Sequence, residues 1–328
     1  MSATATSPDE FRESRLERAR SYADMFPWVW SFIAAIAVWI AIALVAGRGF
    51  GGTLTSALAL APFLVLVGVG QMFVITAGYG AIDLSVPYVM TLTGFITTGI
   101  MNGGQGSVLI GLLAAIGCGL LVGVANVAAI QFLSIPPIVA TLATGLMVQS
   151  WAAVRAGNFN AEVDPGLHDF VVRQWGPIPE LAVFTVVLAA VAGFLLHRTA
   201  WGRALQAAGQ NRRAANLAGL RVSLVLAVAY LICGALAGVS GALLGAYSSP
   251  SLGIGDPFLL NSIAVVVIGG SLIQGGRSNV PGVWGGAMFL ILLVTLLGVL
   301  HINVATQNIV KGGLIILVLA LAGSRKAA

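Results

Sequence analysis

Runs of about twenty apolar residues recur along nearly the whole of this 328-residue chain. Each run can cross the hydrocarbon core of a bilayer as a helix, which needs about 20 apolar residues. Charged residues make up only 8% of the chain, whereas a soluble domain carries about a quarter. The sequence therefore predicts an all-α polytopic membrane protein with about ten transmembrane helices, at 28–46, 54–77, 83–101, 107–130, 137–153, 180–197, 223–247, 258–275, 280–299 and 303–322.

The fifth of these runs is the weakest. Pro136 and Pro137 crowd its start, and Gln149 and Ser150 dilute its end. A broken or partly re-entrant helix is therefore an alternative at this position, provided that protein surrounds it.

The distribution of Lys and Arg predicts the orientation of the chain in the membrane. With the N-terminus inside, twelve of these residues fall in cytoplasmic segments: Arg12, Arg15, Arg18, Arg20, Arg198, Arg203, Arg212, Arg213, Arg221, Arg277, Arg325 and Lys326. Three fall on the opposite side (Arg48, Arg155 and Arg173), and Lys311 lies within the last span. This positive-inside bias places both termini in the cytoplasm, and it explains the net charge of +5 without nucleic acid as a partner.

Three segments follow from this topology. We expect a cytoplasmic N-terminal tail at 1–27, a transmembrane domain at 28–323 and a cytoplasmic C-terminal tail at 324–328. Residues 1–27 are polar and mixed in charge, with no short apolar core before a cleavage pattern, so the first span is expected to be a retained anchor.

A basic cytoplasmic segment at 198–222 separates two of the predicted spans. Its stretch 202–220 is rich in Ala, Leu and Gln, lacks proline and closes near Gly219, which favours one or two short helices. Such helices could dock another protein, or the arginines could meet anionic lipid headgroups around a solvated linker. The residues of this segment alone leave both interpretations open.

Asp83 is the one acidic residue between Asp24 and Glu162, and it lies in GYGAIDLSVP at the junction of two spans. A carboxylate at membrane depth is costly, which makes Asp83 a functional candidate. The alternative is a structural role, in which Asp83 or Ser85 caps the third span and Pro87 lies in its first turn.

Neutral polar residues are scattered through the spans. They could line a hydrophilic pathway or form hydrogen bonds between helices. A charged relay of the kind that proton-driven pumps use is missing from the sequence, which disfavours an ion-coupled carrier. The pathway candidates are Gln71, Asp83, Ser85, Asn126, Thr141, Thr144, Gln149, Asn261, Gln307 and Asn308.

Two enzymatic interpretations find little support in the sequence. GVSG at 238–241 resembles the Gly-x-Ser-Gly of rhomboid proteases, with Ser240 and His301 as a conceivable pair, but these glycines also form a packing stripe. The glycine-rich stretch 263–285 lacks the Gly-Lys-Ser/Thr ending of a phosphate loop. Cys118 and Cys233 lack metal-site spacing, so no catalytic residue, metal or resident cofactor is predicted.

Three blocks of residues 55–322 resemble the permease subunit of bacterial ATP-binding-cassette importers of the ribose, xylose and galactose type. They are GQMFVITAGYGAIDLSVPYVMTLTGFI, GVANVAAIQFLSIPPIVATLATG, and the stretch from TAWGRALQAAGQNRRAANLAGL through IAVVVIGGSLIQGGRSNVPGVWGG. The chain departs from the family pattern at Ala81, Pro87 and Val127, where glycine is common.

The resemblance assigns the basic segment to contact with an ATPase subunit. Ala214, Ala215 and Gly219 keep the spacing of the coupling motif Glu-Ala-Ala-x-x-x-Gly, with Arg213 in place of the acid. The coupling residues that it implies are Asn211, Arg212, Arg213, Ala214, Ala215 and Gly219, of which the three small ones rank first as a contact surface.

The resemblance also implies a mechanism and partners. A periplasmic binding protein would deliver a monosaccharide to a dimer of permeases in the inner membrane. Separate subunits that bind ATP and magnesium would drive alternating access. Permeases for nucleosides or branched-chain amino acids share this general fold, and Ile82-Asp83-Leu84-Ser85 favours the sugar branch.

Overall fold

The apolar runs form long helices in the computed structural model, which describes residues 28–47, 50–157 and 159–324. The long helices are α2 (Val29–Ala46), α3 (Phe50–Thr76), α4 (Val86–Met101), α5 (Val108–Gln131), α6 (Pro137–Gly157), α8 (Glu180–Arg198), α11 (Val222–Ser248), α13 (Val280–Val299) and α14 (Val304–Ser324). The shorter elements are η2 (Asn102–Gly104), α7 (Pro165–Val172), the hairpin of β1 (Gln174–Trp175) and β2 (Ile178–Pro179), α9 (Ala200–Gln210), α10 (Arg212–Leu217) and α12 (Phe258–Ile268).

Seven helices of the described chain are long and apolar enough to cross a membrane: α2, α3, α5, α6, α8, α11 and α13. The other three expected spans correspond to α4, α12 and α14. The chain is therefore a polytopic helical membrane protein, and the count of ten spans stays a prediction. The predicted N-terminal tail 1–27 lies outside the described residues, as does the predicted C-terminal tail 324–328 except for Ser324, which ends α14.

Three predicted spans differ from the helices in the structure. The span predicted at 258–275 ends at Ile268, because Gly270, Gly275 and Gly276 adopt positive φ angles that a helix cannot contain. The span predicted to start at residue 83 starts at Val86. The fifth span is unbroken from Pro137 to Gly157, because proline at the first turn of a helix loses no hydrogen bond there.

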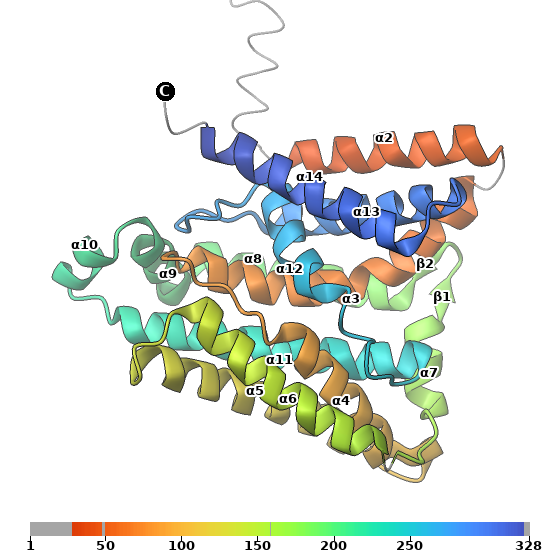
Figure 1. Cartoon of the computed structure of the whole chain (residues 1–328), viewed down its shortest axis with the longest axis horizontal. Coiled ribbons are helices and arrows are strands. Elements are labelled where there is room, and N and C mark those ends of the chain that lie inside the picture. Colours follow the sequence, from red (N-terminus) through yellow and green to blue (C-terminus); the bar gives the residue numbers. More distant parts are fainter. Residues whose placement is uncertain (1–27, 48–49, 158, 325–328) are drawn as a thin grey trace, which may run out of the picture.

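Helix α3 forms the centre of the bundle. In its most apolar 18-residue stretch 83% of the residues are buried, against 22% in α2 and 28% in α5 and in α6. Figure 1 shows α2, α13 and α14 on one side of α3, and α4, α5 and α6 on the other. The exposed apolar faces of the outer helices suit contact with lipid.

Helix α11 packs closely on α4 and α5 through small residues. A Cβ atom at Gly234, Gly238 or Gly241 would collide with the backbone of the facing helix. Ser240 packs on α3 instead, because it is fully buried and its hydroxyl donates to the Phe63 carbonyl at 3.0 Å. His301 is exposed, so the structure supports the packing role of Ser240 and not the protease pair.

The connecting segments gather at two opposite ends of the bundle. Figure 1 shows α9 and α10 at one end, and α7 with the β1–β2 hairpin at the other. We call these the α10 end and the α7 end. The basic segment 198–222 therefore lies at the end opposite to α7 and the β1–β2 hairpin.

Candidate functional site

The segment between α3 and α4, residues 77–85, is non-helical backbone that is buried in large part, although Tyr79 and Gly80 are exposed. Gly78, Tyr79 and Gly80 all have positive φ angles and turn the chain back toward the interior. Asp83 and Ser85 are each only 1% exposed. Buried backbone of this kind needs side chains to satisfy its polar groups.

Asp83 closes the turn at the end of this segment. Its Oδ1 atom accepts hydrogen bonds from the Ser85 backbone N–H (2.9 Å), the Ser85 hydroxyl (2.5 Å) and the Asn126 amide of α5 (3.4 Å). Ser85 is the N-cap residue of α4 but makes no side-chain capping bond. The capping interpretation required a side-chain bond to a free N–H in the first turn of α4. Asp83 instead binds the N–H of Ser85, which precedes the helix, so the structure corrects that interpretation.

Two further helices hold the same segment. With its amide oriented to satisfy both groups, Gln71 of α3 donates to the Asp83 carbonyl (3.2 Å) and accepts from the Asp83 N–H (3.1 Å). Thr141 of α6 accepts from the Leu84 N–H at 3.0 Å. Five of the predicted pathway residues therefore form one buried network, which fixes the 77–85 segment to three helices: Gln71, Asp83, Ser85, Asn126 and Thr141.

The other pathway candidates lie elsewhere. Gln149 donates to the Leu252 carbonyl at 3.4 Å, and Thr144 donates to the Ala140 carbonyl of its own helix. Asn261, Gln307 and Asn308 come together in the wall of one cavity of about 680 Å³ between α3, α12, α13 and α14.

At the α10 end, the residues of the basic segment form two helices with clear boundaries. Asn211 begins α10 by accepting from the Ala214 N–H at 3.0 Å. Gly219 follows it with φ +81, a conformation that favours glycine. Asn211 and Gly219 therefore shape the helix.

The side chains of α10 divide between an inner and an outer face. Ala215 is buried against Ala208 and Val222, so it packs inside the chain and is not part of the free surface that the sequence suggested. Arg212, Arg213 and Ala214 are exposed. Leu217, which the sequence reasoning missed, is 83% exposed. Leu217 could have been recognised from the sequence, because it is an apolar residue in a short polar helix that lies outside the predicted spans.

The C-terminal end of α9 meets two other turns in what we call the glycine junction, formed by Gly78, Gly209, Gly275 and Gly276. A Cβ atom at Gly209 would collide with the Thr76 carbonyl and with the Gly276 backbone. The Gln210 amide donates to the Gly276 carbonyl at 3.3 Å. The junction thus joins α9 to the end of α3 and to the loop before α13.

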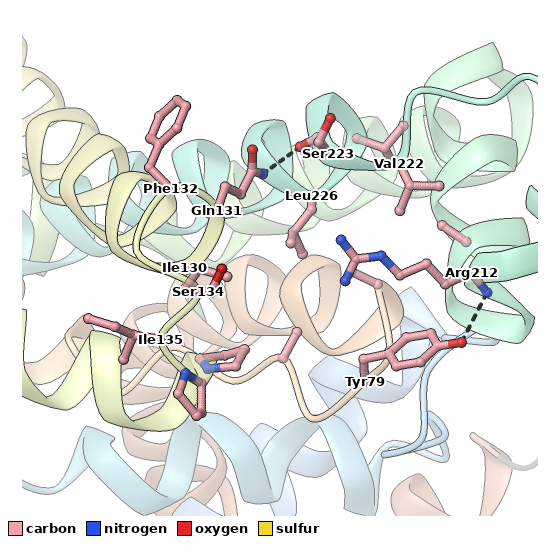
Figure 2. Close-up of a pocket in the computed structure, with 17 residues that line it drawn as sticks. Tyr79, Ile130, Gln131, Phe132, Ser134, Ile135, Arg212, Val222, Ser223 and Leu226 are labelled. Atoms are coloured by element: carbon pink, nitrogen blue, oxygen red, sulfur yellow. Dashed lines mark hydrogen bonds between the residues drawn. The ribbon is translucent and has the colours of Figure 1, made fainter. Parts of the chain in front are cut away.

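Tyr79 links α10 to the segment that Asp83 fixes (Figure 2). Its hydroxyl accepts from the Arg212 N–H at 3.2 Å, and the Arg212 guanidinium lies 5.9 Å from the centre of its ring. Both residues line a pocket of about 520 Å³ at the α10 end, across from the α5–α6 turn. Figure 2 shows the guanidinium pointing into this pocket.

Comparison with known proteins adds to this geometry. Residues 53–319 match the family described as "Branched-chain amino acid transport system / permease component". No solved structure matches the chain.

Several curated proteins are similar over most of their length. The D-allose transport system permease protein AlsC of Escherichia coli (strain K12) is 29% identical, over 78% of this chain and 79% of the relative. The ribose import permease protein RbsC of Bacillus subtilis (strain 168) is 31% identical, over 80% and 82%. The galactofuranose transporter permease protein YtfT of Escherichia coli (strain K12) is 31% identical, over 81% and 74%.

Proposed function

The chain belongs to the family of branched-chain amino acid transport system permease components, and from this premise we propose that it imports a monosaccharide as the membrane subunit of an ATP-driven importer. The similar permeases for allose, ribose and galactofuranose support the sugar class. The chain has no role as an enzyme in this proposal.

The observation that carries the proposal is the attachment of α9 and α10 to the transmembrane core. These helices present Arg212, Arg213, Ala214 and Leu217 at one end of the bundle, and the glycine junction ties α9 to the central helix α3. A force applied to α10 from outside would reach the buried 77–85 segment through Tyr79 and the junction. This arrangement suits a coupling surface for a separate ATPase subunit.

The remaining parts of the proposal follow from that assignment. The α10 end faces the cytoplasm, in agreement with its arginines, and the α7 end faces a periplasmic binding protein. Two permeases pair in the inner membrane, and ATP with magnesium binds the ATPase subunits. Closure of those subunits moves α10 and switches the permeases between outward-open and inward-open states.

Uptake by the reconstituted complex tests this function. Proteoliposomes would carry the permease with its ATPase and would enclose ATP. The binding protein and labelled D-ribose, D-allose or D-fructose would be added outside. ATP-dependent accumulation of one of these sugars is the expected result. Accumulation of leucine or adenosine instead would refute the sugar class, and uptake without ATP would indicate an ion-coupled carrier.

A further inference from the structure

The cavity between α3, α12, α13 and α14 combines polar side chains from three helices with an aliphatic wall. Asn261 comes from α12, Thr295 from α13, and Gln307, Asn308 and Lys311 from α14. The aliphatic part consists of Leu60, Leu64, Leu290, Ile291, Val294 and Val304. Its volume of about 680 Å³ lies within the range of small-molecule sites, about 300–1,000 Å³.

Three polar side chains of this cavity are free to bind something else, whereas Gln307 and Thr295 donate to the Ile302 and Ile291 carbonyls. Within the described part of the chain, Asn261, Asn308 and Lys311 form no side-chain hydrogen bond or ion pair. Lys311 is partly buried in the first half of α14, one turn after Gln307 and Asn308 and before the apolar run that starts at Leu314. Free amide and ammonium groups facing lipid would be costly, so this wall requires water or a polar molecule beside it.

The short helix α12 contributes to the same place. It has 11 residues, and Pro257 and Phe258 at its start line the cavity together with Asp256 of the preceding loop. Unusually short hydrophobic helices often mark substrate sites near the middle of the bilayer in transporters. The cavity is thus formed where the regular bundle gives way to a shorter helix.

We propose that this cavity is a low-affinity station for a neutral polyhydroxylated solute on its way through the membrane, an inference that rests on the proposed function. Sugar hydroxyl groups both donate and accept hydrogen bonds, which matches the two Asn amides, while the ammonium of Lys311 donates to a hydroxyl oxygen. The mostly aliphatic wall offers few other polar contacts. Weak binding suits a solute that must leave again.

Cysteine accessibility tests the station independently of uptake. Asn261→Cys and Asn308→Cys would be placed in a Cys118→Ala, Cys233→Ala background of the assembled complex and treated with a charged methanethiosulfonate reagent. The reagent reacts with thiolate, which forms in water. Ile309→Cys is the matched control, because Ile309 neighbours Asn308 on α14, is 73% exposed and lies outside the cavity.

We expect the two cavity cysteines to react at least about tenfold faster than the control. A saturating concentration of the transported sugar should slow the reaction at Asn261→Cys, whereas leucine should not. Equally slow reaction at all three positions would overturn the proposal, because a dry cavity faces lipid or is covered by a second copy of the chain. Fast reaction that no sugar changes would also overturn it. Sugar uptake by the wild-type complex in the same preparation separates these failures from a failure of the proposed function.

Lys311 provides a second test. Lys311→Met is expected to lower the maximal uptake rate about tenfold, because one charge-assisted hydrogen bond to the sugar is lost. Lys311→Arg should retain most of the uptake rate. The sugar concentration at half-maximal uptake would stay unchanged, because the binding protein sets it. Unchanged uptake by Lys311→Met would contradict the role of this side chain.

Discussion

The backbone N–H of Gly276 donates a hydrogen bond of 2.9 Å to the carbonyl oxygen of Thr76, the last residue of α3. The hydroxyl of Thr76 also lies 2.6 Å from that of Ser278. The loop before α13 is therefore fixed to the end of the central helix, and Gly209 of α9 fits directly against both. We therefore expect a displacement of α9 to move α3 and α13 together.

Gly209→Ala is expected to disturb this junction, because the added Cβ collides with the Thr76 carbonyl. Overpacking of this kind costs about 1–3 kcal/mol, and ATP hydrolysis should become partly uncoupled from uptake. The measurement is the ratio of sugar transported to ATP hydrolysed, together with the melting temperature of the complex in detergent. Gly117→Ala is the control, since its Cβ would meet no atom within 4 Å. A normal ratio in Gly209→Ala would refute the coupling role.

Asp83→Ala is expected to destabilise the permease by about 1–3 kcal/mol, because the Ser85 N–H and the Asn126 amide lose their shared acceptor in a buried place. Asp83→Asn keeps an acceptor oxygen and should assemble more nearly as the wild type does. Thermal stability of the solubilised protein, with uptake measured in parallel, checks both variants. An Asp83→Asn protein that assembles normally but does not transport would show that the carboxyl group itself acts in transport.

Leu217→Ala is expected to weaken binding of the ATPase subunit at least about tenfold, because an exposed apolar side chain at the tip of α10 can act as an interface anchor. The permease itself should fold normally, since Leu217 has little contact within the chain. Co-purification and titration of the ATPase subunit measure the change. Leu224→Ala on α11, where the leucine is 54% exposed, serves as control. Equal affinities for both variants would count against docking at α10.

Ser240→Ala should leave uptake nearly unchanged and cost about 1 kcal/mol of stability, the loss of one hydrogen bond to the Phe63 carbonyl. Uptake and thermal melting of the variant, compared with those of the wild type, provide the check. Loss of proteolysis of a model membrane substrate in this variant would instead support the protease interpretation.

Most long helices could be predicted to within a few residues, because an apolar run of the right length in a chain with few charges has few alternatives. The span at 258–275 was wrong at its end, since apolar residues continue past Ile268 while the glycines set the backbone. The span at 137–153 was predicted with the correct start, and the broken helix left open as its alternative is not what α6 forms, since its prolines lie at the helix start.

The candidate sites were less predictable, since their geometry depends on contacts between distant segments. The sequence identified Gln71, Asp83, Asn126 and Thr141 as polar residues in spans, but not that they converge on one turn. Ala215 and Leu217 lie two positions apart, and only the packing of α9 against α10 shows that the first faces inward. Gly219 was identified from the sequence as the end of the short helices, whereas the role of Asn211 as the cap of α10 required the structure.

The bonds between the Gln71 amide and the Asp83 backbone have a consequence for biosynthesis. Both residues leave the ribosome early and close together in time, long before α11 to α13 exist to cover α3. The turn at 77–85 can therefore form as soon as α3 and its next few residues enter the bilayer, and Gln71 then has a partner while the helix waits in lipid. Later helices assemble around a hairpin in which the Gln71 amide is already paired, and Asn126 and Thr141 then add their hydrogen bonds to it.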